Sequence, residues 1–522
     1  MGLIKKNKIV TSSTSNFVGN LLGFLVTYSI SFFLSPYIVG MLGESAYGFV
    51  SLATSFTNYI TLATVALNSL ASRFISIAIF NNENDKAQKY YSSVMIANII
   101  LSLIFVIPCT IFITKLENFI EIPIGLIIDV KILFAVIFLG FFISLISSLF
   151  SVAVFVENKL YLTAIHNTEA AVLRLILTVA MFIFLPIHVF YIGIITLITN
   201  LYIIFWQYYY KRKYIPQLKV RIKKFEFNKI IELIKAGIWN LISQLSGLLN
   251  TGLDLLLANK FISPSSMGVL SIASTLPSMI QAVLGSVSSA FTPNLTKYYA
   301  HEKYDEMVSE LEKSIRMMNL VLIVPMAGIT VFGGSFYALW QPTQNPQVLQ
   351  TLSVLKILCL TFTGGMAAVH EIFVITNKLK PQAIATLVSG ILNVIIVYFF
   401  LSKTNTGIYA IAGISSVIAI LRNIIFTFPY AAKCIKQKWY VFYKMSFVSF
   451  GTFILLCAVY YIIEKIIILD SWIKFIFVCI PSGLLGLAIV FFIMLKKSER
   501  KIMITKVINK FSGKFIKTRD RK

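Results

Sequence analysis

The sequence is poor in charged residues. Asp, Glu, Lys and Arg make up only 13% of its 522 residues, whereas an ordinary soluble domain carries about 25%. Hydrophobic residues make up 57%, so a folded chain could not cover its surface with polar groups in water. Lipid removes this difficulty, provided that the backbone forms its hydrogen bonds within helices or closed barrels. The apolar runs are long and do not alternate with polar residues, which predicts membrane-spanning helices.

Motifs for metal binding and catalysis are also missing. The chain has five cysteines, mostly in apolar runs, and no Cys-x-x-Cys pair, so we expect neither a disulfide framework nor a zinc site. It lacks the phosphate-loop motif Gly-x-x-x-x-Gly-Lys-Ser/Thr, the His-Glu-x-x-His zinc motif and the Gly-x-Ser-x-Gly nucleophile motif. Its four histidines are scattered. We therefore expect a protein that is not an enzyme and carries no metal or other cofactor.

Fourteen apolar runs are long enough to cross a hydrocarbon core, which takes roughly 20 residues per helix. The expected spans are residues 16–38, 45–70, 91–114, 131–156, 161–186, 188–210, 230–256, 266–292, 317–340, 351–376, 381–402, 408–430, 445–464 and 472–495. Spans 45–70 and 266–292 are polar for lipid, so we expect them to line an interior.

The basic residues that give the chain its net charge of +25 lie mainly in every second loop. If the N-terminus is cytoplasmic, the cytoplasmic segments are 1–15, 71–90, 157–160, 211–229, 293–316, 377–380, 431–444 and 496–522. Excluding Arg73, these segments hold 35 Lys and Arg, against six in the opposite loops. This asymmetry sets the orientation of membrane proteins and predicts that both termini are cytoplasmic. It also argues against nucleic acid as a partner, because the basic residues do not form one solvent-exposed basic face.

The longest basic segment divides the chain into two lobes. We expect an all-α, multi-pass protein in five parts: a six-helix lobe 1–210, a basic linker 211–229, a second six-helix lobe 230–444, an additional helix pair 445–495 and a basic tail 496–522. Two accounts of the linker are open, because it can act as a topology determinant alone or can also contact anionic lipid headgroups.

The two lobes share a sequence pattern. Asn16, Asn20, Gly23 and Thr27 of the first span correspond in order and spacing to Asn240, Gln244, Gly247 and Thr251 of the seventh. The segment Gly48-Phe-Val-Ser51-Leu-Ala53 of the second span corresponds to Gly268-Val-Leu-Ser271-Ile-Ala273 of the eighth. Six spans separate the copies, so both lobes enter the membrane in the same direction. This predicts a parallel repeat about an axis along the membrane normal.

A polar stripe lies on one helical face of the seventh span, formed by Asn240, Gln244, Gly247, Thr251 and Asp254. Such a stripe either packs against neighbouring helices through hydrogen bonds and small residues, or lines a wet cavity. We expect the cavity, because the related stripe of the first span would face it across the axis. Asn20, Asn240 and Gln244 are then candidates for binding a substrate.

Ionisable residues within spans are functional candidates, because each costs about 2.5–3.5 kcal/mol on insertion scales. Arg174 and Arg422 lie in the inner halves of different lobes, and we expect them to bind substrate from facing walls. Structural pairing with Glu169 or Glu371 is the competing account.

The remaining ionisable residues have other expected roles. Asp254, Lys356, His370 and Glu371 are candidates for gating or ion coupling, with pairing of Asp254 and Lys356 as one arrangement. A hydrogen-bonded interior residue is the simpler account of His370. Arg73 and Lys235 lie at span ends, where their side chains can reach the membrane interface.

Two short motifs stand out, the segment Leu42-Gly43-Glu-Ser-Ala-Tyr47-Gly48 at the start of the second span, and Leu253-Asp254 followed by a short loop and Gly268. They resemble motifs of the polysaccharide-transporter branch of the multidrug/oligosaccharidyl-lipid/polysaccharide exporter superfamily. The first resembles the family's Leu-Gly-x-x-x-Tyr-Gly turn, and the second resembles its acidic seventh span and the start of its eighth. Leu255 departs from the pattern, since a basic residue often follows the acid, and this weakens a charge pair there.

This resemblance implies a flippase with two rocking six-helix lobes. It would move polyprenyl-pyrophosphate-linked oligosaccharides across the bacterial cytoplasmic membrane for cell-surface polysaccharide biosynthesis. The implied partners are the glycan substrate, membrane lipids and polysaccharide-assembly enzymes. Ion coupling is common in the superfamily, but the sequence does not name an ion.

Two other functions are alternatives to a flippase, one from the same superfamily and one from another class. A multidrug:cation antiporter of the same superfamily typically has twelve spans and an acidic cavity, whereas this chain has an extra helix pair and two intramembrane arginines. A membrane-embedded glycosyltransferase or polymerase needs a large outer catalytic loop. The longest outer connections here, 115–130 and 341–350, are short.

The topology can be tested with reporter fusions. A reporter that is active only outside the cytoplasm should be silent after Lys224 or Lys436 and active after Gln344 or Thr404, because the basic loops are retained inside. The measurement is reporter activity per amount of fusion protein. Activity after Lys224 would contradict both the alternation of loops and the parallel repeat.

Overall fold

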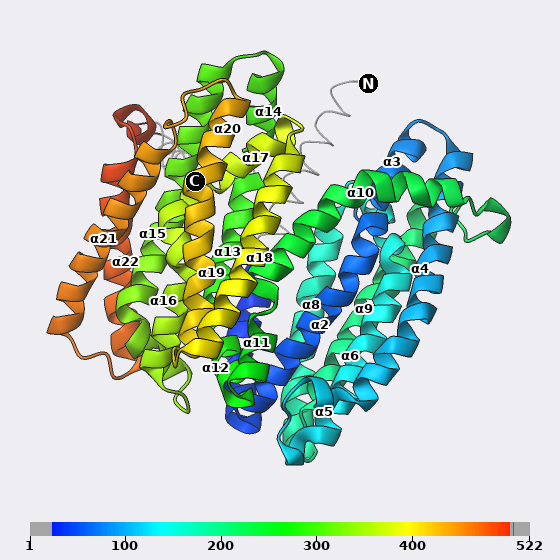
Figure 1. The fold of residues 1–522 in the computed structure, drawn as a ribbon, viewed down its shortest axis with the longest axis horizontal. Coiled ribbons are helices and arrows are strands. Elements are labelled where there is room, and N and C mark those ends of the chain that lie inside the picture. The colour runs from blue at the N-terminus through cyan, green and yellow to red at the C-terminus, as the bar shows by residue number, and fades with distance from the viewer. Residues whose placement is uncertain (1–22, 290, 502–504, 506–522) are drawn as a thin grey trace, which may run out of the picture. The chain divides into compact units, whose positions relative to one another are not determined.

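The computed structural model describes residues 23–289, 291–501 and 505, and these residues form helices without a strand (Figure 1). Fourteen described helical segments are long and apolar enough to cross a membrane, which confirms the expected all-α multi-pass class. They are Gly23–Leu42, Glu44–Phe80, Asn84–Thr114, Ile124–Val156, Leu160–Phe184, Phe190–Tyr214, Phe227–Phe261, Pro264–Gly285, Tyr304–Trp340, Pro346–Ile375, Leu379–Lys403, Ile408–Cys434, Tyr443–Ile466 and Trp472–Met494.

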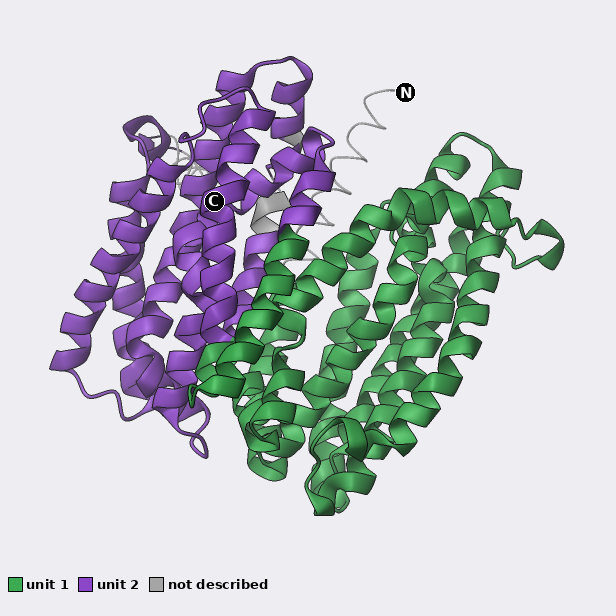
Figure 2. Ribbon diagram, viewed as in Figure 1, with its two compact units in different colours: residues 1–275, 386–411 green, residues 276–385, 412–522 purple. Residues whose placement is uncertain are grey.

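The chain forms two compact units (Figure 2). Unit 1 contains residues 1–275 and 386–411. After the helix Gly23–Leu42, its elements are α2 (Glu44–Asn68), α3 (Ala71–Phe80), α4 (Asn84–Thr114), α5 (Leu116–Phe119), η1 (Ile124–Leu126), α6 (Ile127–Ser147), η2 (Ser148–Ser151), α7 (Val152–Val156), α8 (Leu160–Phe184), α9 (Phe190–Tyr214), η3 (Ile222–Lys224), α10 (Phe227–Gly247), η4 (Leu248–Gly252), α11 (Asp254–Phe261) and α12 (Pro264–Ala273).

Unit 2 contains residues 276–385 and 412–522. Its elements are α13 (Thr275–Ser289), α14 (Thr292–Ala300), α15 (Tyr304–Trp340), α16 (Pro346–Thr363), η5 (Gly364–Met366), α17 (Ala367–Ile375), η6 (Asn423–Thr427), α20 (Phe428–Cys434), α21 (Tyr443–Ile466) and α22 (Trp472–Met494). The helices α18 (Leu379–Lys403) and α19 (Ile408–Arg422) cross the unit boundary within their length, and α13 begins one residue before it. The division into two six-helix lobes stays a prediction.

Two π-helical turns interrupt spans in the described chain, η4 after α10 and η6 after α19. Such turns loosen the regular backbone hydrogen bonding and often mark functional sites. At η4 the freed carbonyls find a partner, because Asn393 Nδ2 donates to Leu249 O at 3.2 Å and to Asn250 O at 2.9 Å. Asp254 begins the helix that follows η4, and Arg422 ends the helix before η6.

Helices α2 and α12 approach each other through two glycines. A Cβ atom on Gly268 would lie 2.1 Å from Glu44 O, and one on Gly48 would lie 2.9 Å from Gly268 N. One turn further, Ser271 Oγ donates to Ser51 Oγ at 2.6 Å. Gly48 and Gly268 are counterparts in the sequence repeat, as are Ser51 and Ser271. Residues that the sequence repeat pairs therefore contact each other between α2 and α12.

The basic linker is docked on α4. The Gln88 side chain donates to Lys219 O and accepts from Lys219 N at 3.1 Å, while Ser92 Oγ accepts from Arg221 N at 3.1 Å. Ion pairs join Lys224 to Asp85 and Lys89 to Glu226. The linker is therefore held to α4 by hydrogen bonds and ion pairs.

In unit 2, α15 anchors the chain that follows α22. Arg316 is buried and donates from Nε and Nη2 to the two carboxylate oxygens of Glu499, at 2.9 and 2.6 Å. Burial alone would raise the pKa of Glu499, but the hydrogen bonds from Arg316 and the Lys496 amide outweigh it and lower the pKa.

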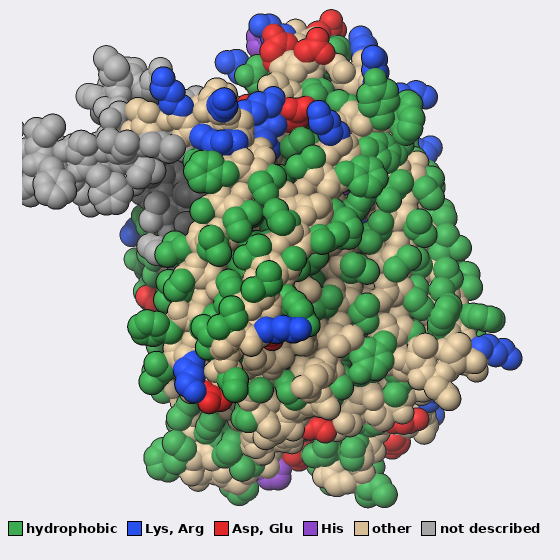
Figure 3. All heavy atoms as spheres, turned by 90° about the vertical axis from the view of Figure 1, so that its left-hand side faces the viewer, with side chains coloured by type: hydrophobic (Ala, Val, Ile, Leu, Met, Phe, Trp, Pro, Cys, Tyr) green, Lys and Arg blue, Asp and Glu red, His purple; other side chains and the backbone are tan. Residues whose placement is uncertain are grey.

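Hydrophobic side chains cover the middle of the face that carries α21 and α22, with Lys and Arg gathered along one rim (Figure 3). Exposed side chains of α21 and α22 include Phe447, Ile454, Ile462, Phe477 and Leu484. An exposed apolar area of this extent marks a membrane contact.

The glycine contact gives a stability prediction. Gly268→Ala should lower the thermal stability of the purified protein, because the new methyl group collides with the α2 backbone, and overpacking of this kind costs about 1–3 kcal/mol. Gly328→Ala is the matched control, since a Cβ atom there meets nothing within 4 Å and Ala is the better helix former. Thermal unfolding in detergent measures both. Equal stability of Gly268→Ala and wild type would contradict the close packing.

Candidate functional site

The polar stripe of α10 faces α2 within unit 1. Asn240 Nδ2 donates to Ser69 Oγ at 3.1 Å, so one end of the stripe is used for packing. Beside this contact lies a cavity of about 510 Å³. Its lining residues are Thr61, Thr64, Val65, Asn68, Ser69, Asn240, Ser243 and Gln244. The stripe thus contributes both to helix packing and to a cavity.

A second cavity continues along the same two helices. Its volume is about 330 Å³, and it shares Thr61, Val65 and Gln244 with the first. It is further lined by Ser55, Asn58, Tyr59, Leu62, Gly247, Leu248, Thr251 and Gly252. Tyr59 Oη donates to Gly252 O at 2.7 Å, so it binds a carbonyl of the π-helical turn. The lining of both cavities is rich in hydroxyl and amide groups and contains no Asp, Glu, Lys or Arg, which suits an uncharged, hydroxylated ligand.

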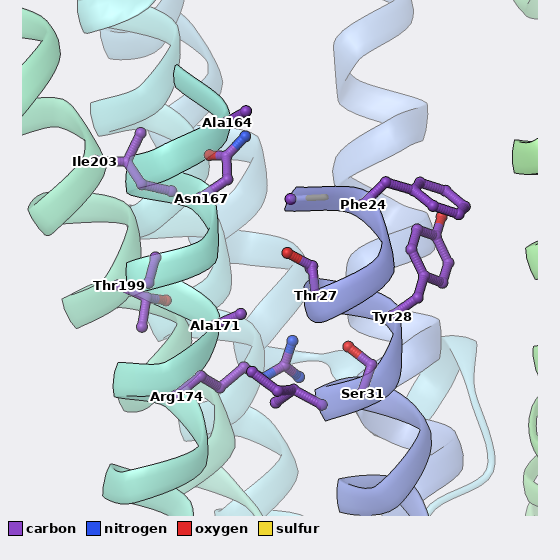
Figure 4. A pocket seen from close by; sticks show the side chains of 13 residues that line it. Phe24, Thr27, Tyr28, Ser31, Ala164, Asn167, Ala171, Arg174, Thr199 and Ile203 are labelled. Atoms are coloured by element: carbon purple, nitrogen blue, oxygen red, sulfur yellow. The ribbon is translucent and has the colours of Figure 1, made fainter. Parts of the chain in front are cut away.

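A third cavity of unit 1 contains Arg174 (Figure 4). It has a volume of about 400 Å³ and lies between the helix Gly23–Leu42, α8 and α9. The residues that line it are Gly23, Phe24, Thr27, Tyr28, Ile30, Ser31, Ala164, Asn167, Ala170, Ala171, Arg174, Thr199 and Ile203. The Arg174 side chain extends from α8 toward the helix that carries Thr27 and Ser31.

The charge of this cavity is positive. No Asp or Glu is among its lining residues, and within the described ranges no atom accepts a hydrogen bond from Nε of Arg174. Guanidinium groups bind carboxylate and phosphate oxygens through paired hydrogen bonds. Hydroxyls of Thr27 and Ser31 on the facing helix line the same cavity. The cavity can therefore hold an anion.

Glu169, which the sequence offered as a structural partner of Arg174, makes its hydrogen bonds elsewhere. Its Oε2 accepts from Tyr202 Oη at 2.6 Å and lies 2.6 Å from His166 Nδ1. His166 in turn lies 2.9 Å, through Nε2, from Tyr210 Oη. Sequence reasoning missed this group. The His-x-x-Glu spacing on a helix was the available signal, since residues three apart share a face.

In unit 2, Arg422 is half-buried and interacts electrostatically with Cys359 and His370. The Nδ1 atom of His370 is 3.2 Å from Gln382 Nε2, and Glu371 Oε2 accepts from Thr292 Oγ1 at 3.1 Å. These residues thus lie among polar side chains of unit 2. That Arg422 shares a cavity with Arg174 stays a prediction.

The other predicted residues are placed as follows. Asp254 is 4% exposed, follows η4 and interacts electrostatically with Tyr59. Lys356 lies in α16, and its pairing with Asp254 stays a prediction. Arg73 on α3 and Lys235 on α10 are exposed. The predicted residue Asn20 lies outside the described residues. Among those that are described, no three His, Cys, Asp or Glu side chains form a group that could hold a metal ion.

The helical architecture and its polar cavities define a multi-pass membrane protein with the fold of a transporter superfamily. An inward-facing multidrug resistance transporter of the MATE family, in the MOP superfamily, matches with a TM-score of 0.64 and 16% identity, over 80% of this chain and 98% of that one. The lipid II flippase MurJ in its inward closed conformation matches with a TM-score of 0.64 and 15% identity, over 92% and 98%.

The chain belongs to the family described as "Polysaccharide biosynthesis protein", which it matches over residues 13–299. It is also 27% identical over 491 residues to the "Uncharacterized membrane protein EpsK" of Bacillus subtilis (strain 168), across 94% of this chain and 97% of that protein. The polysaccharide-transporter family predicted from the short motifs is thereby confirmed.

Asp254 gives a functional prediction. Asp254→Asn should impair export while protein abundance stays near normal, because Asn keeps the shape of the side chain and one acceptor oxygen but removes its charge. Export is measured as surface polysaccharide in cells, and abundance by immunoblot of membranes. Normal export would mean that Asp254 is a structural hydrogen-bonding group. If Lys356→Ala is harmless while Asp254→Asn is not, only the predicted pairing fails.

Proposed function

We propose that the protein is a flippase that moves polyprenyl-pyrophosphate-linked oligosaccharide units across the bacterial cytoplasmic membrane for cell-surface polysaccharide biosynthesis. Membership of the polysaccharide biosynthesis family supports the pathway. The fold shared with the lipid II flippase and with MATE transporters supports movement of a substrate by alternating access.

The Arg174 cavity is the observation that carries this proposal. A lipid-linked sugar presents a diphosphate within the membrane, where an unneutralised anion is costly. Arg174 supplies a fixed positive charge in a cavity lined by hydroxyl and amide groups and by no carboxylate. The planar guanidinium stays charged and can bind two phosphate oxygens at once. This cavity therefore has the chemistry that a pyrophosphate needs.

The two neutral cavities between α2 and α10 suit the sugar part of the same substrate. Their side chains, among them Asn68, Asn240 and Gln244, offer amide donors and acceptors to sugar hydroxyls without demanding a charge. The lipid tail needs no dedicated pocket, because it can remain in the bilayer beside the exposed apolar helix faces. Each part of the amphiphile thus has a surface of matching polarity.

A multidrug:cation antiporter is the second candidate, and the likeness to a MATE transporter favours it. Organic cations require acidic groups in the binding cavity. The three cavities described above contain one arginine and no Asp or Glu among their lining residues. This polarity supports an anionic or neutral substrate over a cationic drug.

Substitution of the two arginines tests the function. Arg174→Ala or Arg422→Ala should lower flipping of an undecaprenyl-pyrophosphate-linked oligosaccharide in reconstituted vesicles by about tenfold or more, because hydrogen bonds to charged groups contribute about 1.5–3 kcal/mol. Lys at either position should restore only part of the activity, since it offers a single compact charge. Arg212→Ala is the matched control, because Arg212 lies in the last turn of α9, outside these cavities.

Two outcomes would contradict the proposed role of the arginines. One is full activity of the double Ala variant. The other is a loss of thermal stability in detergent that tracks the loss of activity in every variant, because the arginines would then act as structural partners. Cells that lack the gene should accumulate lipid-linked sugar intermediates. Their absence would argue against the flippase function itself.

A further inference from the structure

A buried histidine lies between an acid and a phenol where α8 packs on α9. His166 is 8% exposed, and its Nδ1 atom lies 2.6 Å from Glu169 Oε2. Its Nε2 atom lies 2.9 Å from Tyr210 Oη, and its ring stacks on Trp206 with a centroid distance of 4.4 Å and an interplanar angle of 9°. Both ring nitrogens are thus engaged by oxygen atoms in a span of the membrane.

Both charge states of His166 can keep these two contacts. With His166 neutral, Nδ1–H donates to the Glu169 carboxylate and Nε2 accepts from the Tyr210 hydroxyl. When Nε2 takes up a proton, it becomes a donor, and the Tyr210 hydroxyl turns from donor to acceptor. The pair of His166 and Glu169 then changes from one net negative charge to an ion pair of zero net charge. The network can therefore take up one proton without losing a hydrogen bond.

The space beside His166 is too small for a hydrated ion. A cavity of only about 10 Å³ adjoins the ring, lined by Val154, Thr163, His166, Ile203, Trp206, Gln207 and Tyr210. One water molecule needs roughly 10–15 Å³. A proton fits such a site, whereas a hydrated sodium ion does not.

The surroundings of the pair contain tyrosines and few charges. Helix α9 contributes Tyr202, which donates to Glu169 at 2.6 Å, and Tyr210, which interacts electrostatically with Tyr161, Tyr209 and Tyr214. From α7 only the apolar Val154 borders the adjoining cavity, and the helix Gly23–Leu42 contains no charged residue. On α8 itself, Arg174 lies eight residues beyond His166, or about 12 Å along the axis.

A short chain of aromatic rings connects the pair to the end of α9. Tyr210 stacks on Tyr214 with a centroid distance of 5.8 Å, and Lys159 Nζ lies 4.1 Å from the centre of the Tyr214 ring. Tyr214 is the last residue of α9, at the end predicted to be cytoplasmic. The side chain of Glu169 is 47% exposed, so the carboxylate is reachable as well. His166 is buried, whereas Glu169 is exposed and can exchange a proton with the surroundings.

We propose that His166 and Glu169 form a proton-binding site that couples transport to the proton gradient. The coupling rests on the flippase function proposed above, but the binding of a proton does not. Protonation changes the net charge of α8 about two turns from Arg174 and reverses the hydrogen bond between α8 and α9. By linkage, a site that changes charge beside an anion-binding group also changes the affinity for that anion.

Trp206 provides a direct readout of protonation, because an imidazolium ring quenches the fluorescence of an indole stacked on it. The protein for this test keeps Trp206 as its sole tryptophan, with Trp239, Trp340, Trp439 and Trp472 replaced by Phe. Its fluorescence should fall as the pH is lowered, because the imidazole of His166 then gains a positive charge.

Variants in the same background identify the group that titrates. His166→Gln should abolish the pH-dependent change, and the matched control His301→Gln, in an exposed turn, should leave it intact. Tyr210→Phe and Glu169→Gln should each shift the midpoint, because they remove the two groups that contact the ring. A fluorescence change that persists in His166→Gln, or the lack of any change in the parent protein, would overturn the site. If His166→Gln does not fold, the two midpoint shifts decide, and unshifted midpoints overturn it.

Transport tests the coupling separately. In vesicles, flipping of an undecaprenyl-pyrophosphate-linked oligosaccharide by the wild type should change when a pH gradient is imposed, and His166→Gln should lose this response. Wild-type flipping that ignores the gradient, beside an intact fluorescence titration, would overturn the coupling and leave the flippase function standing. If the wild type does not flip the probe at all while the titration is present, the proposed function fails and the proton site remains.

Discussion

A polar group without a partner is costly in hydrocarbon, and this cost organises the whole chain. It restricts the backbone to helices, and it directs polar side chains either to one another or into cavities. Asn240 hydrogen-bonds to Ser69, whereas Gln244 one turn further lines two cavities. The backbone obeys the same rule, since Asn393 binds the carbonyls that the π-helical turn releases. Polar residues that the packing leaves available therefore mark the binding surfaces.

The cost of an unpartnered polar group also explains why two faces of α8 differ, one carrying hydrogen-bonded polar groups and the other lining a cavity. Glu169 turns toward α9, where His166 and Tyr202 bind its carboxylate. Arg174 turns toward the helix Gly23–Leu42 and lines a cavity without an acid. Because Glu169 is engaged on one side, it does not cancel the charge of Arg174 on the other. A single helix can in this way carry an anion site and a proton site.

The sequence predicted the spans, the family and the polar stripe because each depends on local patterns. Hydropathy needs only a window of about 20 residues, and the stripe of α10 follows from helical spacing alone. The contact of His166 with Tyr210 was not predictable, because Tyr210 is 44 residues away and the contact depends on how α8 packs against α9. The contact of His166 with Glu169 was within reach of the sequence, because residues three apart share a helical face. The π-helical turns were missed because they depend on backbone geometry, for which the composition of α10 and α19 gives no signal.

The meeting of repeat counterparts at Gly48 and Gly268 has an evolutionary consequence. If the two halves arose by duplication of one gene segment, a larger side chain in the ancestral segment would have appeared twice at the same crossing and collided with its own copy. After duplication, a substitution at one of the two positions would not have allowed a larger residue at the other, because each glycine packs against the backbone of the partner helix. These two positions could not drift independently. The pair should therefore keep the ancestral residue long after neighbouring positions on the two helices have diverged.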